Sequence, residues 1–515
     1  MYQDAVSHHK TMGDVDVIYH DGVYHLFHLV LPNHDFIAHA ISRDGINWKR
    51  IDNAIFIGNP GKWDDHMLWT MHVTPDPWKP GRWRMFYTGL SRCDGGNIQR
   101  VGCAYSEDLI HWEKAPDRWE ECHDDKKNSG GESSEKPCPF PIEAKAPHYE
   151  ASLDEGRHWI SFRDPFFFQE GEYRCLLVAA RVPTGPIIRR GCVALYEEKE
   201  PCHFVERHAL HQPGLYDDIE VPNLFKFGDR YYLVASIRED AKVRYWYSDN
   251  VDGPWANFFD NVLLPQGNYA ARFCFDEKGL LVWNFFHSET DRTVKNLMPP
   301  PKRIVTREDG RLGAVSFEGF DKLVESTCHF DDLLPLSPLM DNKHAECHVD
   351  REAQELQLSS EAGFEGFVVS EKVRCFRLRA TLSLDGLGKC GLLFRTDAET
   401  TSGYQISLDL QKGIAQCRAW GRKPHGTREN AFDFKPLQAG YWQNCGADDL
   451  EFSLVAMQSY IELSLGGYVL LTLSDETYTS GRVGLYVESS CLKVSNLKLE
   501  HFHPPRTADW PELET

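Results

Sequence analysis

The sequence predicts an all-β protein in which a five-bladed β-propeller is followed by a β-sandwich. A short turn-and-strand pattern occurs five times within the first 325 residues, and after about residue 347 the strands largely alternate apolar with polar residues. No stretch of useful length has helical periodicity. At 515 residues the chain is also too long for one ordinary hydrophobic core, so two domains are expected.

The repeat is a turn that contains glycine, followed by a strand rich in aromatic and β-branched residues. Each copy is preceded by another apolar strand, and such a pair is typical of a β-hairpin. Radial arrangement of the units leaves only short sheet edges exposed, which favours a propeller. The five copies are 21–27, 81–87, 171–177, 228–234 and 278–283.

The same patterns predict the domain bounds. We expect a propeller catalytic domain over residues 1–325, a linker over 326–346, a sandwich over 347–505 and a tail over 506–515. Alternation of apolar and polar residues in the second domain is typical of an antiparallel sandwich. The segments with this alternation are 378–384, 390–395, 404–410, 450–455 and 461–465.

A long polar and proline-rich insertion at residues 113–158 interrupts the propeller repeat. Insertions of this kind usually lie on one rim of a propeller, and long loops are either functional or mobile. The sequence decides neither the role of this insertion nor that of the sandwich, for which bracing the propeller is the default interpretation.

Composition limits the classes of partner. A formal net charge of -21 repels phosphate backbones and anionic lipid heads, so a neutral substrate fits better than nucleic acid or a membrane. The chain has no apolar run of 18 residues, and its N-terminus resembles no signal peptide. Fifteen cysteines are an odd number without paired CxxC spacing, so we expect reduced thiols and a cytoplasmic location. The sequence leaves a homo-oligomer open.

Three acids occupy nearly equivalent positions at the starts of blades. Asp14 and Glu220 lie eight residues before the glycine of the following turn, and Asp164 lies seven before it. The first strands of all blades line the central channel, so these side chains should converge. Burial of three acids is costly, and glycoside cleavage is a reaction that needs both an ionised and a protonated carboxyl group. The alternative is that the acids only bind turn amides.

Two short segments resemble glycoside hydrolase family 32, which includes invertases, levanases and inulinases. Residues 162–165 (F-R-D-P) are similar to its R-D-P motif, and residues 220–225 (E-V-P-N-L-F) to its E-C-P-D-L-F segment. The resemblance spans about residues 10–325, and the C-terminal domain is similar to the family's second domain. It implies a five-bladed propeller, a fructofuranosyl substrate and retention of anomeric configuration. Supporting segments are 85–89, 98–106, 268–271 and 310–312.

The resemblance also implies roles for individual residues. Asp14 would be the nucleophile and Glu220 the general acid/base. Asp164 would stabilise the transition state and hold sugar hydroxyls together with Arg163. Val221 stands where the family has Cys beside the acid, which leaves the substrate within the wider propeller clan open.

The first family motif, W-M-N-D-P-N-G, is only partly present. This chain has T-M-G-D-V-D-V at residues 11–17 and lacks the Trp, Asn and Pro. A gapless count from Tyr24 places the family's Asp near Gly13, so a one-residue shift is needed and Asp16 is a rival to Asp14. The spacing that Asp14 shares with Glu220 favours Asp14, and Asp16 is then expected to contact substrate.

Aromatic walls that stack on a sugar ring are expected around the acids. Trp69, His66 and Tyr269 fall near the channel-side starts of blades two and five. The alternatives are that Trp69 belongs to the core between blades and that His66 is a structural histidine.

We predict no cofactor and no metal. The pair His8 and His9 and the group Cys122, His123 and Cys138 lack a defined ligand spacing.

The sequence thus predicts a glycoside hydrolase of the β-fructofuranosidase type. It would cleave terminal fructofuranosyl units from a short oligosaccharide by a retaining two-carboxylate mechanism, with carboxyl groups about 5–5.5 Å apart. One alternative is a family 43-like arabinofuranosidase or xylosidase, which inverts configuration and needs about 6.5–9.5 Å. Arg163 and the segment 310–312 favour family 32. The other alternative is a sugar-binding propeller without activity, against which the cost of burying idle acids argues.

Overall fold

The computed structural model describes residues 2, 11–119, 139–287, 296–397, 402–422, 432–442 and 449–503. These residues form β-strands joined by loops and a few short 3-10 turns, which confirms the all-β class. The chain divides into two compact units, the first ending at Leu312 and the second beginning at Gly313. In the described part, no helix is long and apolar enough to cross a membrane.

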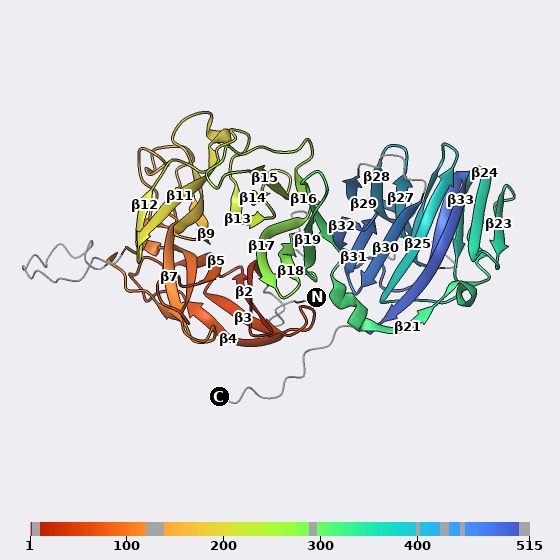
Figure 1. The fold of residues 1–515 in the computed structure, drawn as a ribbon, viewed down its shortest axis with the longest axis horizontal. Helices are drawn as coiled ribbons and strands as arrows, with labels where there is room; N and C mark the ends of the chain where they lie inside the picture. The colour runs from red at the N-terminus through yellow and green to blue at the C-terminus, as the bar shows by residue number, and fades with distance from the viewer. Residues whose placement is uncertain are drawn as a thin grey trace, which may run out of the picture. The chain divides into compact units, whose positions relative to one another are not determined.

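Residues 11–315 form five antiparallel sheets of four strands each, which confirms the predicted five-bladed propeller (Figure 1). The last of these strands crosses the boundary between the two units. Each blade is numbered in chain order. The inner strands contact one another in a closed ring, each touching the inner strands of the two neighbouring blades. They are β1 (Thr11–His20), β5 (Met67–Pro75), β9 (Phe162–Glu170), β13 (Glu220–Phe227) and β17 (Asn268–Asp276).

The second strand of each blade carries the sequence repeat. Its turn glycines Gly22, Gly171 and Gly228 have φ of 77°, 57° and 63°, a conformation that glycine adopts at no steric cost. The second strands are β2 (Val23–Leu31), β6 (Trp83–Leu90), β10 (Tyr173–Arg181), β14 (Arg230–Ile237) and β18 (Gly279–Phe286).

Two further strands complete each blade. The third strands are β3 (Phe36–Ser42), β7 (Arg100–Ser106), β11 (Gly191–Glu200), β15 (Lys242–Ser248) and β19 (Lys302–Thr306). The outer strands are β4 (Lys49–Phe56), β8 (Glu113–Lys114), β12 (His203–Glu206), β16 (Val262–Leu264) and β20 (Leu312–Val315). Apolar side chains fill the spaces between blades; Phe86 of blade two, for example, stacks on Phe167 of blade three with ring centroids 5.7 Å apart.

A register shift interrupts the pairing of every inner strand with its neighbour. It falls at Met12–Val15 in β1, at Trp69–Met71 in β5, opposite Leu177–Ala179 in β9, at Glu220–Asn223 in β13 and at Tyr269–Arg272 in β17. A β-bulge of this kind bends the strand and redirects a side chain. The inner strands of all five blades therefore contain a β-bulge or a similar irregularity.

Arg272 links the inner strands at these bulges. Its guanidinium group is buried and donates hydrogen bonds to the carbonyl oxygens of Pro165 and Pro222, both at 2.8 Å, and of Met71 at 3.4 Å. Its Nε lies 4.0 Å from Oδ1 of Asp16. One side chain of blade five thus reaches the other four blades.

The second unit is built on a sheet of 13 strands that packs around one apolar core, and this confirms the predicted sandwich-type domain. The long strand β33 (Arg482–Phe502) pairs with four others, β21 (Val324–Cys328), β24 (Glu355–Val368), β25 (Phe376–Asp385) and β26 (Lys389–Thr396). The remaining strands are β22 (Ser337–Pro338), β23 (Ala345–Asp350), β27 (Gly403–Asp409), β28 (Ile414–Arg422), β29 (Phe432–Tyr441), β30 (Leu450–Met457), β31 (Tyr460–Leu465) and β32 (Tyr468–Ser474).

The segment expected to be a linker, 326–346, carries paired strands in the structure. The end of β21 pairs with β33, and β22 and the start of β23 pair with β24. Such short strands are held by backbone hydrogen bonds, which the side-chain pattern does not reveal. The boundary between the two compact units lies earlier in the chain, between Leu312 and Gly313.

Residues 139–158 of the long insertion pack against the propeller. Phe140, Ile142 and Tyr149 are buried in the apolar cluster between blades two and three. Ile142 also exchanges backbone hydrogen bonds with Val101 of β7. Residues 120–138 of the insertion lie outside the described part.

Candidate active site

The structure brings Asp14, Asp164 and Glu220 together. Asp14 and Asp164 lie in the bulges of β1 and β9, and Glu220 is the first residue of β13. Burial raises the pKa of Asp14 to about 7, with the negative charges of Asp164 and Glu220 adding to the effect. Burial likewise raises the pKa of Asp164, and Arg163 opposes the shift. Carboxylates that perturb one another in this way share one site.

Thr70 lies between two of the acids. Its hydroxyl donates a hydrogen bond to Oδ2 of Asp14 and also lowers the pKa of Asp164. Thr70 occupies the bulge of β5, so blade two contributes a hydroxyl where three other blades contribute an acid. Sequence reasoning missed this residue because the turn after β5 is longer than in the other blades; its position directly after Trp69 was the available signal.

Glu220 is held at both carboxylate oxygens. Arg163 donates from Nη2 to Oε1 at 2.5 Å, and the Tyr269 hydroxyl donates to Oε2. Arg163 also approaches Asp164, with 3.6 Å between its Nε and Oδ2. The backbone N–H of Val221 donates to the same Oδ2 at 3.0 Å. Arg163 therefore connects two of the three acids.

Asp218 forms an ion pair with Arg163. Its Oδ2 lies 3.2 Å from Nη2 of Arg163 and 2.9 Å from Nη1 of Arg157, and its Oδ1 accepts from the Ser161 hydroxyl at 3.1 Å. Burial opposes ionisation of Asp218, but the charges of Arg163 and Arg157 outweigh it and lower the pKa of this carboxyl. Asp218 is a fixed anion that orients Arg163, and sequence reasoning missed it.

Asp16 has a different environment from Asp14. Its Oδ2 accepts a hydrogen bond of 2.5 Å from the backbone N–H of Val73 and lies 3.4 Å from Nδ1 of His72. With Arg272 on its other oxygen, the Asp16 carboxylate joins β1 to the backbone of blade two. The hydrogen bonds of Asp16 are thus made to the scaffold.

The three residues expected to stack on a sugar ring, Tyr269, Trp69 and His66, have different contacts. Tyr269 bonds Glu220 directly. Trp69 is half-buried, its ring lies 5.9 Å from that of His34, and its indole N–H is buried without a protein hydrogen-bond partner. His66 lies in the loop before β5, where its backbone N–H donates to Leu90. The residues considered for a metal, His8, His9, Cys122, His123 and Cys138, lie outside the described part.

Comparison with known proteins finds similar sequences and structures. The family model described as "Glycosyl hydrolases family 32 N-terminal domain" matches residues 8–129, a range that includes Asp14. A cell wall isozyme of β-fructofuranosidase from Pisum sativum is 25% identical over 230 residues. That alignment covers 42% of this chain and 34% of the pea protein, so the chain spans about a third of the length of this relative.

Solved structures of the same architecture cover nearly the whole chain. Exo-inulinase from Aspergillus awamori superposes with a TM-score of 0.66 at 14% identity, covering 96% of both chains. Fructan 1-exohydrolase IIa from Cichorium intybus, as a variant in complex with 1-kestose, gives 0.65 at 15% identity over 96% of both chains. Sucrose-6-phosphate hydrolase from Lactobacillus gasseri gives 0.65 at 14% identity, covering 97% of this chain and 94% of that one.

The class follows from these observations: the chain is a five-bladed propeller with three gathered carboxylates, followed by a sandwich-type domain. In its fold and in its N-terminal sequence the chain is similar to glycoside hydrolases of family 32.

Proposed function

We propose that this protein is a retaining glycoside hydrolase that releases terminal fructofuranosyl units from short fructose-containing oligosaccharides. The observation that carries the proposal is the convergence of Asp14, Asp164 and Glu220 from three blades, with Arg163 and Tyr269 bonded to Glu220. The β-fructofuranosidase relative and the family 32 match support the fructosyl specificity.

Asp14 is the proposed nucleophile. Its carboxylate would attack the anomeric carbon of the fructosyl unit, and Glu220 would protonate the leaving oxygen. In the second step Glu220 would take a proton from water, which then cleaves the fructosyl–enzyme bond. Since burial raises the pKa of Asp14 to about 7, attack requires that this group first lose its proton. Asp14 is preferred to Asp16 because the Asp16 carboxylate already accepts a hydrogen bond from the backbone N–H of Val73 and lies beside His72 and Arg272.

Asp164 and Arg163 are the proposed binding pair for sugar hydroxyls. Val221 and Arg163 hold the Asp164 carboxylate in place, so the protein sets the orientation of its remaining hydrogen-bond acceptor sites. Preorganised groups of this kind stabilise developing charge without reorganising during the reaction. A spacing of about 5–5.5 Å between the carboxyl groups of Asp14 and Glu220 is part of the proposal.

A substrate panel tests the proposal. Wild-type protein is incubated with sucrose, inulin-type and levan-type oligosaccharides, and with aryl arabinofuranosides and xylosides. Fructose release alone supports the proposal. Release of arabinose or xylose would favour the family 43 alternative, and sugar binding without cleavage would favour the inactive propeller. Full activity of Glu220→Gln on a substrate with a poor leaving group would contradict the acid assignment.

A cytoplasmic location is a further part of this proposal. It rests on the odd cysteine number, which is unusual for a disulfide framework. The pea relative is by its name a cell wall isozyme, and its location is not carried over. Fractionation of the source cells, with the native chain detected by antibody, checks this part.

A further inference from the structure

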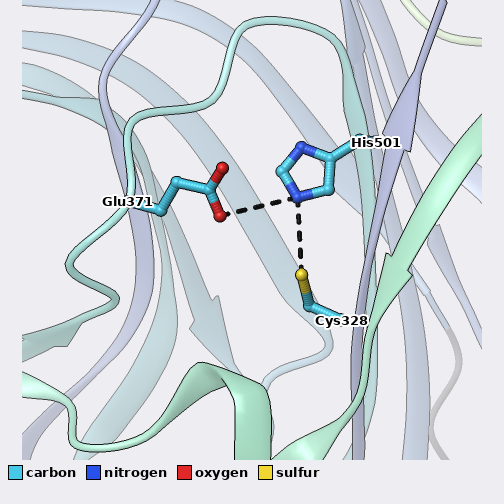
Figure 2. A group of neighbouring side chains, drawn as sticks. All are labelled: Cys328, Glu371 and His501. Carbon is cyan, nitrogen blue, oxygen red and sulfur yellow. Dashed lines mark hydrogen bonds and ion pairs between the residues drawn. The ribbon is translucent and has the colours of Figure 1, made fainter.

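Three potential metal ligands meet in the second unit, apart from the acids described above. Cys328 ends β21, Glu371 lies in the loop between β24 and β25, and His501 is near the end of β33. Figure 2 shows the side chains of Glu371 and Cys328 facing the same ring nitrogen of His501. Nε2 lies 3.6 Å from Sγ of Cys328 and 3.7 Å from Oε2 of Glu371.

These contacts differ from those of a catalytic Cys–His–acid arrangement. In such a relay the nucleophile and the acid bond opposite ring nitrogens, so that one nitrogen accepts a proton while the other donates. Here both groups approach Nε2, and the carboxylate distance is too long for a hydrogen bond. The thiol and the carboxylate therefore both face the same ring nitrogen of His501, and the contact of the thiol with this nitrogen is within hydrogen-bond distance for sulfur.

The three groups have the chemistry of metal ligands. An imidazole, a carboxylate and a thiol, which a bound divalent cation deprotonates, offer one ligand atom each.

We propose that Cys328, Glu371 and His501 bind a zinc ion. Tetrahedral Zn²⁺ has bonds of about 2.3 Å to sulfur and about 2.0–2.2 Å to nitrogen and oxygen, which place neighbouring ligand atoms roughly 3.3–3.6 Å apart. The two contacts at Nε2 are close to this range, and all three ligand atoms lie within 4.8 Å of one another. Thiolate and imidazole together select zinc over magnesium and calcium.

Water completes the coordination. The side chain of Glu371 is 59% exposed and that of His501 20%, so solvent reaches the proposed fourth position. The ion would join three segments: the strand β21, the loop before β25 and the end of β33. Because β21 pairs with the end of β33, the proposed site reinforces an edge of the sheet. No short motif in the sequence predicts this site, because its ligands come from three distant segments.

Zinc titration of the metal-stripped full chain by isothermal calorimetry tests the proposal. Wild-type protein is expected to bind one equivalent of zinc. Cys328→Ser and His501→Ala should each lower the zinc affinity by at least about tenfold, because even residues that only hydrogen-bond to metal ligands contribute about 10–100-fold. Cys491→Ser and His503→Ala are matched controls. Cys491 lies in β33 and His503 just after it, outside the three ligands, and both variants should bind as the wild type does.

Cobalt substitution gives a second measurement that is independent of variant folding. Co²⁺ added to wild-type protein should show the sulfur-to-metal charge-transfer absorption of a thiolate ligand, and Cys491→Ser should keep it. Absence of this absorption, or a zinc affinity unchanged in both Cys328→Ser and His501→Ala, would overturn the proposal. Thermal unfolding of each variant without metal identifies any that fails to fold.

Discussion

Blades one, three and four differ from blades two and five in what they place at the shared bulge. The first group contributes Asp14, Asp164 and Glu220, and the second contributes the hydroxyls of Thr70 and Tyr269, each bonded to one of the acids. The β-bulge or similar irregularity of the inner strand is common to all five. The propeller therefore brings one inner-strand residue of each blade to a common place, and the blades differ in the chemical group of that residue.

Removal of a carboxyl group should lower the activity more than any other change. We expect Asp14→Asn to lower kcat by at least about 10⁴-fold and Glu220→Gln by about 10²–10⁴-fold, because a nucleophile and a general acid are lost. Steady-state fructose release measures both. Asp16→Asn is the matched control in the same strand, and an equally large kcat loss in a fully folded Asp16→Asn would contradict the assignment of Asp14.

Asp218 tests whether the acids depend on a supporting anion. We expect Asp218→Asn to lower kcat by about 10–100-fold, since Arg163 loses the partner that holds it against Glu220. KM should change less than kcat because Asp218 acts through Arg163, with its described contacts made to Arg163, Arg157 and Ser161. A variant that affects KM alone would show that Asp218 acts in binding.

Thr70→Val tests the role of the hydroxyl group that blade two contributes. The Thr70 hydroxyl lowers the pKa of Asp14, so its removal should raise that pKa above about 7. The proposed nucleophile acts when ionised; the acid limb of the kcat/KM profile should therefore move to higher pH by on the order of one unit. A pH profile of both proteins checks the shift, and an unmoved limb would contradict the role of Thr70.

An effect on stability is also expected. The pKa of Asp14 is raised in the folded state from 3.8 to about 7, so burial of the ionised form destabilises the protein as pH rises through this window. Asp14→Asn should stabilise the fold by on the order of 4 kcal/mol above pH 7 and by nothing below pH 4, as each of these roughly three pKa units is worth about 1.36 kcal/mol. Urea unfolding at pH 4 and pH 8 gives the difference; equal stability at both would contradict it.

The sequence predicted the blades and the acids because both rest on local patterns. The turn glycines and strand residues recur in each blade, and the acids keep a nearly constant spacing from those turns. Thr70, Asp218 and the hub Arg272 were missed, because their roles come from contacts between blades. The strands within 326–346 were missed for a related reason, since short edge strands are fixed by their partners.

The central claim is that Asp14 and Glu220 act as a retaining pair on a fructosyl substrate. Nuclear magnetic resonance of the first fructose released from 1-kestose, recorded before mutarotation, tests it most directly. The account predicts that β-fructofuranose appears first and that Asp14→Asn releases none. Initial formation of the α anomer, or undiminished release by Asp14→Asn, would contradict it.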